Sequence, residues 1–287
     1  MPTKIIEFLA TPFMPRSERR SRRLLELEHQ RLLELEHRYA TDYLTSKGWH
    51  ESAATGEATD KQGPVPWYTY PAQMMLERVV QHHHRVFEYG AGNSSLWWAH
   101  RVAEVVSVEH DAKWATMVSS KAPSNLKVVA CPIGTKTSEE DERLLDAYYA
   151  LGLTLPQLPS HEAMVYHGAL ATREFSAYVL ELTKYPRGYF DIIVVDGMAR
   201  VVTAWLAAQY VKPNGFIVFD NSDRRLYNEG YALLAKSGFK RIDFYGSGPV
   251  LSYEWCTSLF AREFEWLAVN SLIPENQLSD IEVFLSE

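Results

Sequence analysis

The stretch Val86-Phe-Glu-Tyr-Gly-Ala-Gly-Asn-Ser-Ser95 decides the fold prediction for this chain. A short apolar strand runs into an acidic residue, Glu88, and then into two glycines, Gly90 and Gly92. Glycine permits a tight turn and lets the backbone approach a ligand that a Cβ would block. A helix that begins at Asn93–Ser95 would present N–H groups to that ligand. The pattern predicts a strand–turn–helix unit with a small-molecule site at the turn.

Three later strands are predicted to end in acidic residues at the same edge of the sheet. Glu109 ends the apolar run after Val105, Asp196 ends the run after Tyr189, and Asp220-Asn221 follows Gly215-Phe-Ile-Val-Phe219. A carboxylate at the position of Glu109 can accept both hydroxyls of a ribose. A lone Gly-x-Gly also fits an ordinary strand-to-helix turn. The series of acids favours a nucleoside-bearing cofactor over that alternative.

The chain alternates predicted strands and helices, which is typical of an α/β, doubly wound and mainly parallel sheet. After a helix at 71–81, we expect strands at 85–88, 104–109, 126–131, 189–195 and 215–219, and helices at 93–101, 111–120, 198–210 and 224–237. An antiparallel pair, 241–245 and 255–261, closes the series. We therefore divide the chain into an N-terminal helical extension with linker, 1–66, and an α/β domain, 67–287. The domain has an insertion at about 134–182, which we expect to shape the substrate pocket.

The N-terminal extension contains an eight-residue repeat in a strongly helix-forming stretch. Leu24-Leu-Glu-Leu-Glu-His29 recurs as Leu32-Leu-Glu-Leu-Glu-His37, after a cluster of five arginines between positions 16 and 23. We interpret it as a helix that packs on its own domain or forms a homo-oligomer with a second subunit. Docking to a membrane surface or another partner is the alternative. The segment 52–63 is predicted to be a loop.

Composition narrows the class of protein. The chain has 287 residues, 46% of them hydrophobic, and a formal net charge of −7, which argues against nucleic acid as the main partner. Two cysteines are too few for a disulfide framework and fit a reducing, cytoplasmic setting. No apolar run approaches the roughly 20 residues of a membrane span. The apolar run near the start of the chain is too short and too acidic for a signal peptide.

As a series, these motifs resemble the class I S-adenosylmethionine-dependent methyltransferases over about Trp67 to Phe264. The resemblance implies a seven-stranded, Rossmann-like sheet. It also implies cofactor contacts from Glu88, Gly90, Gly92, Asn93, Ser94, Ser95, Glu109, His110 and Asp196. In that assignment Glu88 lies near the amino end of the cofactor, Glu109 holds the ribose and His110 borders the adenine. Acidic residues suit a sulfonium cation, whereas a pyrophosphate prefers N–H groups and basic residues.

Asp196, Asp220 and Asn221 form a second predicted site, with catalytic and metal-ligating roles. They supply three hard oxygen ligands suited to magnesium or calcium. The arrangement is similar to that of metal-dependent, catechol-type O-methyltransferases, with one departure: Ala199 stands where that branch has a lysine base. The alternative is that Asp220 caps the following helix. Ser222–Tyr227 follows and is expected either to overhang the pocket or to form the first turn of that helix.

Three functions remain open from the sequence. Pro66-Trp-Tyr-Thr-Tyr-Pro71, ahead of the glycine motif, and the late Asp-Asn-Ser-Asp223 resemble a bacterial branch of the methyltransferases, which implies transfer to an oxygen of a small molecule or glycan. An NAD(P)-dependent oxidoreductase is the enzymatic alternative, weakened by Ser95 in place of a third glycine. A non-catalytic, cofactor-binding partner subunit that docks through the leading helix is the third possibility. In the insertion, His161, Glu162 and His167 do not have the spacing of a strong metal pattern.

Overall fold

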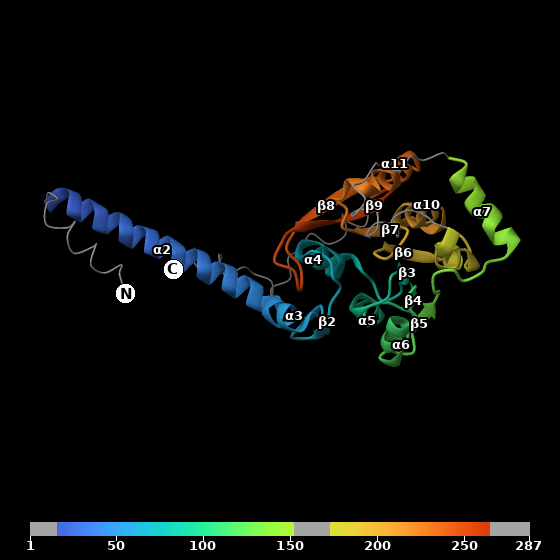
Figure 1. Ribbon diagram of the computed structural model, residues 1–287, viewed down its shortest axis with the longest axis horizontal. Coiled ribbons are helices and arrows are strands. Elements are labelled where there is room, and N and C mark those ends of the chain that lie inside the picture. Colours follow the sequence, from blue (N-terminus) through green and yellow to red (C-terminus); the bar gives the residue numbers. More distant parts are fainter. Residues whose placement is uncertain (1–15, 152–172, 265–287) are drawn as a thin grey trace.

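The computed structural model describes residues 16–151 and 173–264, which form a seven-stranded sheet with helices on both faces and one long projecting helix (Figure 1). The strand order is β5–β4–β3–β6–β7–β9–β8. Neighbouring strands from β5 to β7 are parallel, and β9 is antiparallel to both β7 and β8. The strands are β3 (Arg85–Tyr89), β4 (Glu104–Glu109), β5 (Leu126–Ala130), β6 (Phe190–Val195), β7 (Val211–Asp220), β8 (Lys240–Gly246) and β9 (Trp255–Ala261).

The order of the strands places a crevice in the middle of the sheet. From β3 the chain moves outward through β4 to β5, then returns to the other side of β3 and continues through β6 to β7. The connections that follow β3 and β6 therefore lead to opposite sides of the sheet. In α/β sheets such a switch point, at the carboxyl ends of the strands, is where ligands bind.

Alternating strand residues bury the two faces of the sheet under different helices. Val86 points to a layer built with Trp97 and Trp98, whereas Phe87 points to a layer built with Val202 and Leu234. The first layer involves α4 (Tyr70–Val79) and α5 (Asn93–Ala99), and the second α9 (Ser176–Leu180), α10 (Arg200–Tyr210) and α11 (Asn228–Lys236). The remaining helices of the body are α6 (Ala112–Ser120), α7 (Glu139–Tyr149) and the 3₁₀ turns η1 (Arg173–Phe175), η2 (Glu181–Lys184) and η3 (Arg225–Tyr227).

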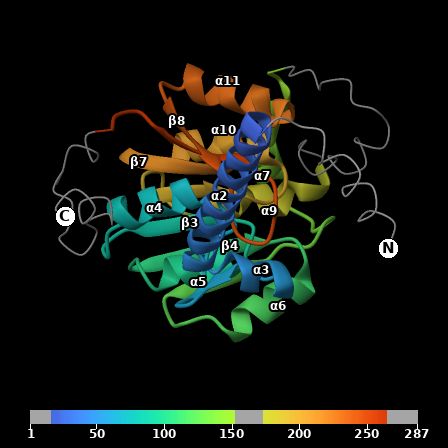
Figure 2. The same cartoon turned by 90° about the vertical axis from the view of Figure 1, so that its left-hand side faces the viewer.

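The N-terminal extension has a projecting part and a part fastened to the body. Helix α2 (Arg16–Ser46) points away from the sheet, as the side view and the end-on view agree (Figures 1 and 2). Helix α3 (Trp49–Thr55) and the hairpin of β1 (Thr59–Asp60) and β2 (Gly63–Pro64) lie against the body. The indole N–H of Trp49 donates to the carbonyl of Leu251 at 2.9 Å. Within the described ranges, no helix combines the length and apolar character that a membrane crossing requires.

The predicted fold class is confirmed, and most predicted elements match within a few residues. Strand β7 begins earlier than predicted, because Val211 pairs with Phe190 ahead of a register shift. The predicted loop at 52–63 is wrong in part, since α3 reaches Thr55 and a short hairpin follows. The six leucines of α2 between positions 24 and 35 do not pack on their own domain, because each is at least half exposed. His161, Glu162 and His167 lie outside the described residues.

Candidate active site

A pocket of about 360 Å³ opens at the carboxyl ends of β3, β4 and β6. Its walls come from the glycine loop after β3, the end of β4, one face of α6, the loop after β6 and the segment 56–58 ahead of the hairpin. The pocket therefore occupies the switch point of the sheet. The sequence-predicted residues that line it are Gly90, Gly92, Asn93, Ser94, Glu109, His110 and Asp196.

The glycine loop packs backbone to backbone against the loop after β6. Gly90 has φ of +96°, and a Cβ there would lie 3.0 Å from the Cα of Gly197. A Cβ on Gly197 would lie 2.0 Å from the hydroxyl oxygen of Tyr178. The second glycine of this contact was not singled out from the sequence. Both positions need glycine, because any larger side chain would push the two loops apart and change the floor of the pocket.

Three consecutive N–H groups of the glycine loop are used inside the protein. The N–H of Gly90 donates to the carbonyl of Val108 at 2.9 Å, and that of Ala91 donates to Oε2 of Glu109 at 3.1 Å. The N–H of Gly92 donates to Oγ of Ser95 at 3.0 Å. These donors are not presented to a ligand, which differs from a loop that cradles phosphates. The loop is instead fixed in shape by the strand, the acid and the serine around it.

Glu88 and Ser95 lie beneath the loop and do not line the pocket. Oε2 of Glu88 accepts hydrogen bonds from the hydroxyl of Ser95 and, at 2.7 Å, from that of Ser107, whereas Oε1 has no partner among the described residues. The carboxyl is fully buried, and loss of hydration raises its pKa from 4.5 to about 7, although the serine hydrogen bonds oppose the rise. The side chain thus supports the loop from below, while any contact with a cofactor remains a prediction.

Glu109 is held rigidly at the end of β4, with its carboxylate in the pocket wall. Oε1 accepts the backbone N–H groups of His110 at 2.8 Å and Asp111 at 2.9 Å, and lies 2.7 Å from Nδ1 of His110. Burial opposes ionisation, but the hydrogen bonds from His110 and the backbone prevail and lower the pKa of Glu109. The same contact raises the pKa of His110. Glu109 therefore stays an ionised acceptor, as recognition of hydroxyl groups requires.

An aromatic wall and a short N-terminal segment complete the pocket. Trp114, 45% exposed, lines it from the first turn of α6, and its indole N–H donates to the carbonyl of Ala91 at 2.6 Å. The side-chain amide of Asn93 donates to the carbonyl of Ala58 at 2.9 Å, which draws the segment 56–58 against the glycine loop. Trp67 also lines the pocket and is 40% exposed, whereas Tyr70 is buried in the core. A flat apolar group can be held against these indole faces.

Arg200 brings together the acidic residues at the ends of β6 and β7. One terminal nitrogen of its guanidinium donates to Oδ1 of Asp196 at 3.1 Å, and the other donates to Oδ1 of Asn221 at 3.1 Å and to the carbonyl of Asp220. Burial and the neighbouring Asp220 raise the pKa of Asp196, and Arg200 opposes that rise. Burial likewise raises the pKa of Asp220. Asp196 and Arg200 both line the pocket, and the second oxygen of Asp196 accepts no hydrogen bond from the described residues.

The predicted metal ligands do not fit a magnesium site. Oδ1 of Asp220 accepts the indole N–H of Trp255 at 3.0 Å and the hydroxyl of Thr257, so this carboxyl is engaged on the far side from Asp196. Oδ1 of Asp196 and Oδ1 of Asn221 already accept hydrogen bonds from the Arg200 guanidinium, so neither of these oxygens is free to coordinate a metal ion. In the described part of the chain, no group of three or more histidine, cysteine or carboxylate side chains can hold a metal. The alternative of Asp220 as a helix cap is also wrong, because its carboxyl bonds to β9.

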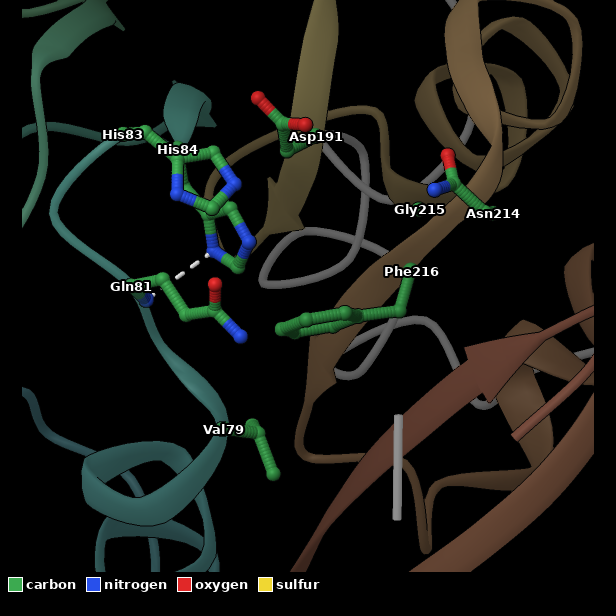
Figure 3. A pocket seen from close by; sticks show the side chains of 8 residues that line it. All are labelled: Val79, Gln81, His83, His84, Asp191, Asn214, Gly215 and Phe216. Carbon is green, nitrogen blue, oxygen red and sulfur yellow. Dashed lines mark hydrogen bonds between the residues drawn. The ribbon is translucent and has the colours of Figure 1, made fainter. Parts of the chain in front are cut away.

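A second, smaller pocket of about 200 Å³ lies at the opposite, amino edge of β6 and β7 (Figure 3). His83, His84, Asp191 and Asn214 are among its lining residues. The backbone N–H of Gln81 donates to Nδ1 of His84 at 3.2 Å, and Lys212 pairs with Asp191 at 2.5 Å. Burial lowers the pKa of His84. The polar side chains of this pocket are therefore partnered within the protein by these contacts.

The sequence matches no protein-family model and no curated protein. The structure resembles solved structures at low identity. A precorrin-8W decarboxylase of Methanobacterium thermoautotrophicum is 13% identical, with 71% of this chain and 95% of that chain covered and a TM-score of 0.41. A methyltransferase-like protein of Silicibacter pomeroyi is 18% identical (77% and 95% covered, TM-score 0.39), and a TehB-like SAM-dependent methyltransferase of Corynebacterium glutamicum is 9% identical (66% and 86% covered, TM-score 0.39). At these values the resemblance concerns the fold alone.

Two residues of the pocket were missed or undervalued by sequence reasoning. Nothing in the sequence assigned Arg200 a role, yet it organises the acidic end of the site. Trp114 had one available signal, since it is a large aromatic in the first turn of the helix that follows Glu109. In the segment after β7, neither Asp223 nor Tyr227 lines the pocket. Asp223 accepts a hydrogen bond from the backbone N–H of Cys256 at 3.3 Å, and Tyr227 is buried beside Arg200.

Proposed function

We propose that this protein transfers a methyl group from S-adenosylmethionine to an oxygen of a small molecule or glycan, in a cytoplasmic setting. The proposal combines the class I methyltransferase resemblance of the sequence, the doubly wound sheet with its closing antiparallel strand, and the pocket at the switch point. Two free, buried cysteines are compatible with the proposed compartment.

The observation that carries the proposal is the internal use of the N–H groups of the glycine loop. A dinucleotide places its pyrophosphate on such donors. Here Ala91 and Gly92 donate to Glu109 and Ser95, so a pyrophosphate would have to displace bonds that the fold makes. A nucleoside linked to a sulfonium makes no such demand. This favours S-adenosylmethionine over NAD for the same pocket.

The residues of the pocket fit the parts of that cofactor. Oε2 of Glu109 accepts one backbone N–H and keeps further acceptor capacity for ribose hydroxyls. Trp114 and His110 supply flat surfaces next to that acid, suited to an adenine ring. Asp196 adds negative charge on the opposite wall, where a cationic sulfur would be stabilised. When bound, S-adenosylmethionine supplies an electrophilic methyl group on a sulfonium.

For an oxygen acceptor, Asp196 is the group we assign to the proton. Its raised pKa makes the carboxylate a better proton acceptor than an exposed aspartate, and one of its oxygens is open to the pocket. The hydroxyl proton would move to that oxygen. Arg200 would hold the carboxylate through its other oxygen and place a fixed positive charge beside the oxygen that becomes the nucleophile. Positioning supplies much of the remaining rate enhancement for an in-line transfer.

Calorimetric titration with S-adenosylhomocysteine and, separately, NAD tests the cofactor. We expect binding of the former alone, weakened at least tenfold in Glu109→Gln. Glu104→Gln is the matched control, because Glu104 lies at the amino end of the same strand, away from the pocket. Thermal melts of each variant show whether it is folded. Binding of NAD, or equal affinity of the two variants for S-adenosylhomocysteine, would overturn the assignment.

Turnover with candidate hydroxyl acceptors then tests the assignment of Asp196 and Arg200. Asp196→Asn should abolish transfer while leaving S-adenosylhomocysteine affinity within a few-fold. A chelator should leave turnover unchanged, because Arg200 occupies the place of the predicted metal. Loss of turnover on chelation, restored by magnesium, would show that a metal site forms after all. A protein that binds the cofactor tightly yet transfers to no acceptor would support the non-catalytic partner alternative.

A further inference from the structure

Helix α2 carries an apolar surface that the rest of the described chain leaves exposed. It has 31 residues and is therefore about 46 Å long; it projects from the body in Figure 1 and, seen from that side, lies in front of the body in Figure 2. Its carboxyl end meets the body through an edge-to-face contact of Tyr43 with Tyr70. Between positions 24 and 35 it carries six leucines, whose exposed fractions are 58% (Leu24), 65% (Leu25), 55% (Leu27), 54% (Leu32), 50% (Leu33) and 53% (Leu35).

Five of the six leucines lie on one side of the helix. At 100° per residue, Leu27, Leu24, Leu35, Leu32 and Leu25 follow one another across an arc of about 160°, and Leu33 lies outside it. The arc also contains two charged residues of this segment, Glu28 and Arg31, both near its centre. Six exposed leucines within twelve positions exceed the scattered apolar residues of an ordinary surface and indicate an interaction site.

We propose that α2 pairs with α2 of a second copy of this chain in an antiparallel arrangement. One register pairs four of the five leucines of the arc: Leu24 of each copy lies at the level of Leu35 of the other, and Leu27 at the level of Leu32. The same register places Glu28 opposite Arg31 twice, once on each side of the two-fold axis. An isologous interface of this kind repeats every contact, so each complementary pair counts double. A parallel pairing would instead place Glu28 against Glu28 and Arg31 against Arg31, which is repulsive.

The charges along α2 favour this partner over a membrane. Positions 16–23 hold five arginines and one glutamate, whereas positions 24–46 hold five acidic residues and two arginines. In the antiparallel pair the basic end of one helix lies beside the acidic half of the other. An anionic membrane would attract the arginines but repel the acids interspersed with the leucines. The proposal does not depend on the proposed enzymatic function.

Sedimentation equilibrium of the full chain over a range of concentrations tests the pairing. The wild type should be a dimer, and Leu35→Glu should weaken dimerisation on the order of 100-fold, because two leucines leave the interface and two charges enter it. Leu33→Glu is the matched control: the same change, two positions away and similarly exposed, but outside the arc. It should leave the dimer intact. Equal melting temperatures of the three proteins would show that the body is unaffected.

Charge reversal tests the direction of the helices. Glu28→Arg alone should weaken the dimer about threefold to tenfold, since it then faces Arg31 of the partner copy, and adding Arg31→Glu should restore it. A parallel dimer would respond to neither change. A wild type that is monomeric at all concentrations, a dimer that Leu33→Glu disrupts as strongly as Leu35→Glu, or no response to charge reversal would each overturn the proposal. Binding of the monomer to anionic phospholipid vesicles would identify the membrane as the occupant instead.

Discussion

Replacing Glu88 by glutamine should remove a large part of the pH dependence of stability. The carboxyl of Glu88 is fully buried, and its pKa rises from 4.5 to about 7 in the folded protein. Its ordinary value applies to the unfolded chain, so between these two pH values the folded state binds a proton that the unfolded state releases. Stability contributed by the protonated form is therefore complete below pH 4.5 and is lost as the pH rises to about 7.

The size of the loss follows from the two values. One pH unit corresponds to about 1.36 kcal/mol, so the interval from 4.5 to about 7 corresponds to about 3 kcal/mol. Glutamine keeps an oxygen that can accept from Ser95 and Ser107 and carries no charge at any pH. The stability of the wild type relative to Glu88→Gln should therefore fall by about this amount across the interval.

Urea unfolding followed by circular dichroism, at a series of pH values from about 4.5 to about 8, measures this difference. Taking the difference between the two proteins cancels the titration of groups they share. Glu254→Gln, an exposed glutamate, is the matched control and should follow the wild type throughout. If wild type and Glu88→Gln lose stability in parallel over this range, Glu88 is ionised in the folded state at every pH, and the serine donors outweigh the loss of hydration.

Three further outcomes follow from contacts in the site. Gly197→Ala should destabilise the protein more than Gly188→Ala in chemical unfolding. A Cβ at position 197 would lie 2.0 Å from the hydroxyl of Tyr178, whereas a Cβ at position 188 has nothing within 4 Å. Adding Tyr178→Phe to Gly197→Ala should recover part of the lost stability. Contact with Glu109 raises the pKa of His110 above 6.5, so the stability that the protonated imidazole contributes is complete below that value and is lost as the pH rises through the folded pKa. The loss of unfolding free energy caused by His110→Gln should therefore be larger at about pH 5.5 than at about pH 9. An equal loss at both pH values would contradict the ion pair. Binding of S-adenosylmethionine near neutral pH should release protons from the pocket wall that contains Asp196, and S-adenosylhomocysteine, which lacks the sulfonium, should release fewer. Calorimetry in buffers of different ionisation enthalpy measures the number of protons released by each ligand. Equal release by the two ligands would show that Asp196 does not lie near the sulfur.

The fold was predictable because its signals are local and repeated. Each strand of the parallel sheet is a short apolar run, and the glycines and acids that follow mark where it ends. The exceptions have non-local causes. Strand β7 extends back to Val211 only because Phe190 of the neighbouring strand is there to pair with it. The helix α3 is short and polar, and its place depends on contacts such as that of Trp49 with Leu251, two hundred residues away in sequence.

The site was predictable in its position and less so in its chemistry. The carboxyl ends of parallel strands lie at one edge of the sheet, so Glu109 and Asp196, at the ends of the strands on either side of β3, were expected in one pocket, and both line it. The sequence does not show which way each side chain turns. Asp220 turns toward Trp255 and Thr257 because the antiparallel strand β9 places those donors beside it. Strand β9 comes 35 residues later, so no local pattern around Asp220 indicates it.

The balance of charge explains why one arginine can decide what the pocket accepts. Glu88, Asp196 and Asp220 lie together at the ends of three strands, and burial raises the pKa of each. Arg200 neutralises at most one of them, and its guanidinium donates to five oxygens at the ends of β6 and β7 and in the loops that follow. A metal ion needs a coordination shell that these oxygens, already bonded to Arg200, Trp255 and Thr257, do not offer, whereas a pyrophosphate would add negative charge to an acidic site. A sulfonium adds one positive charge without needing a coordination shell, so among the ligands considered it is the one whose binding lowers the electrostatic cost of burying these acids.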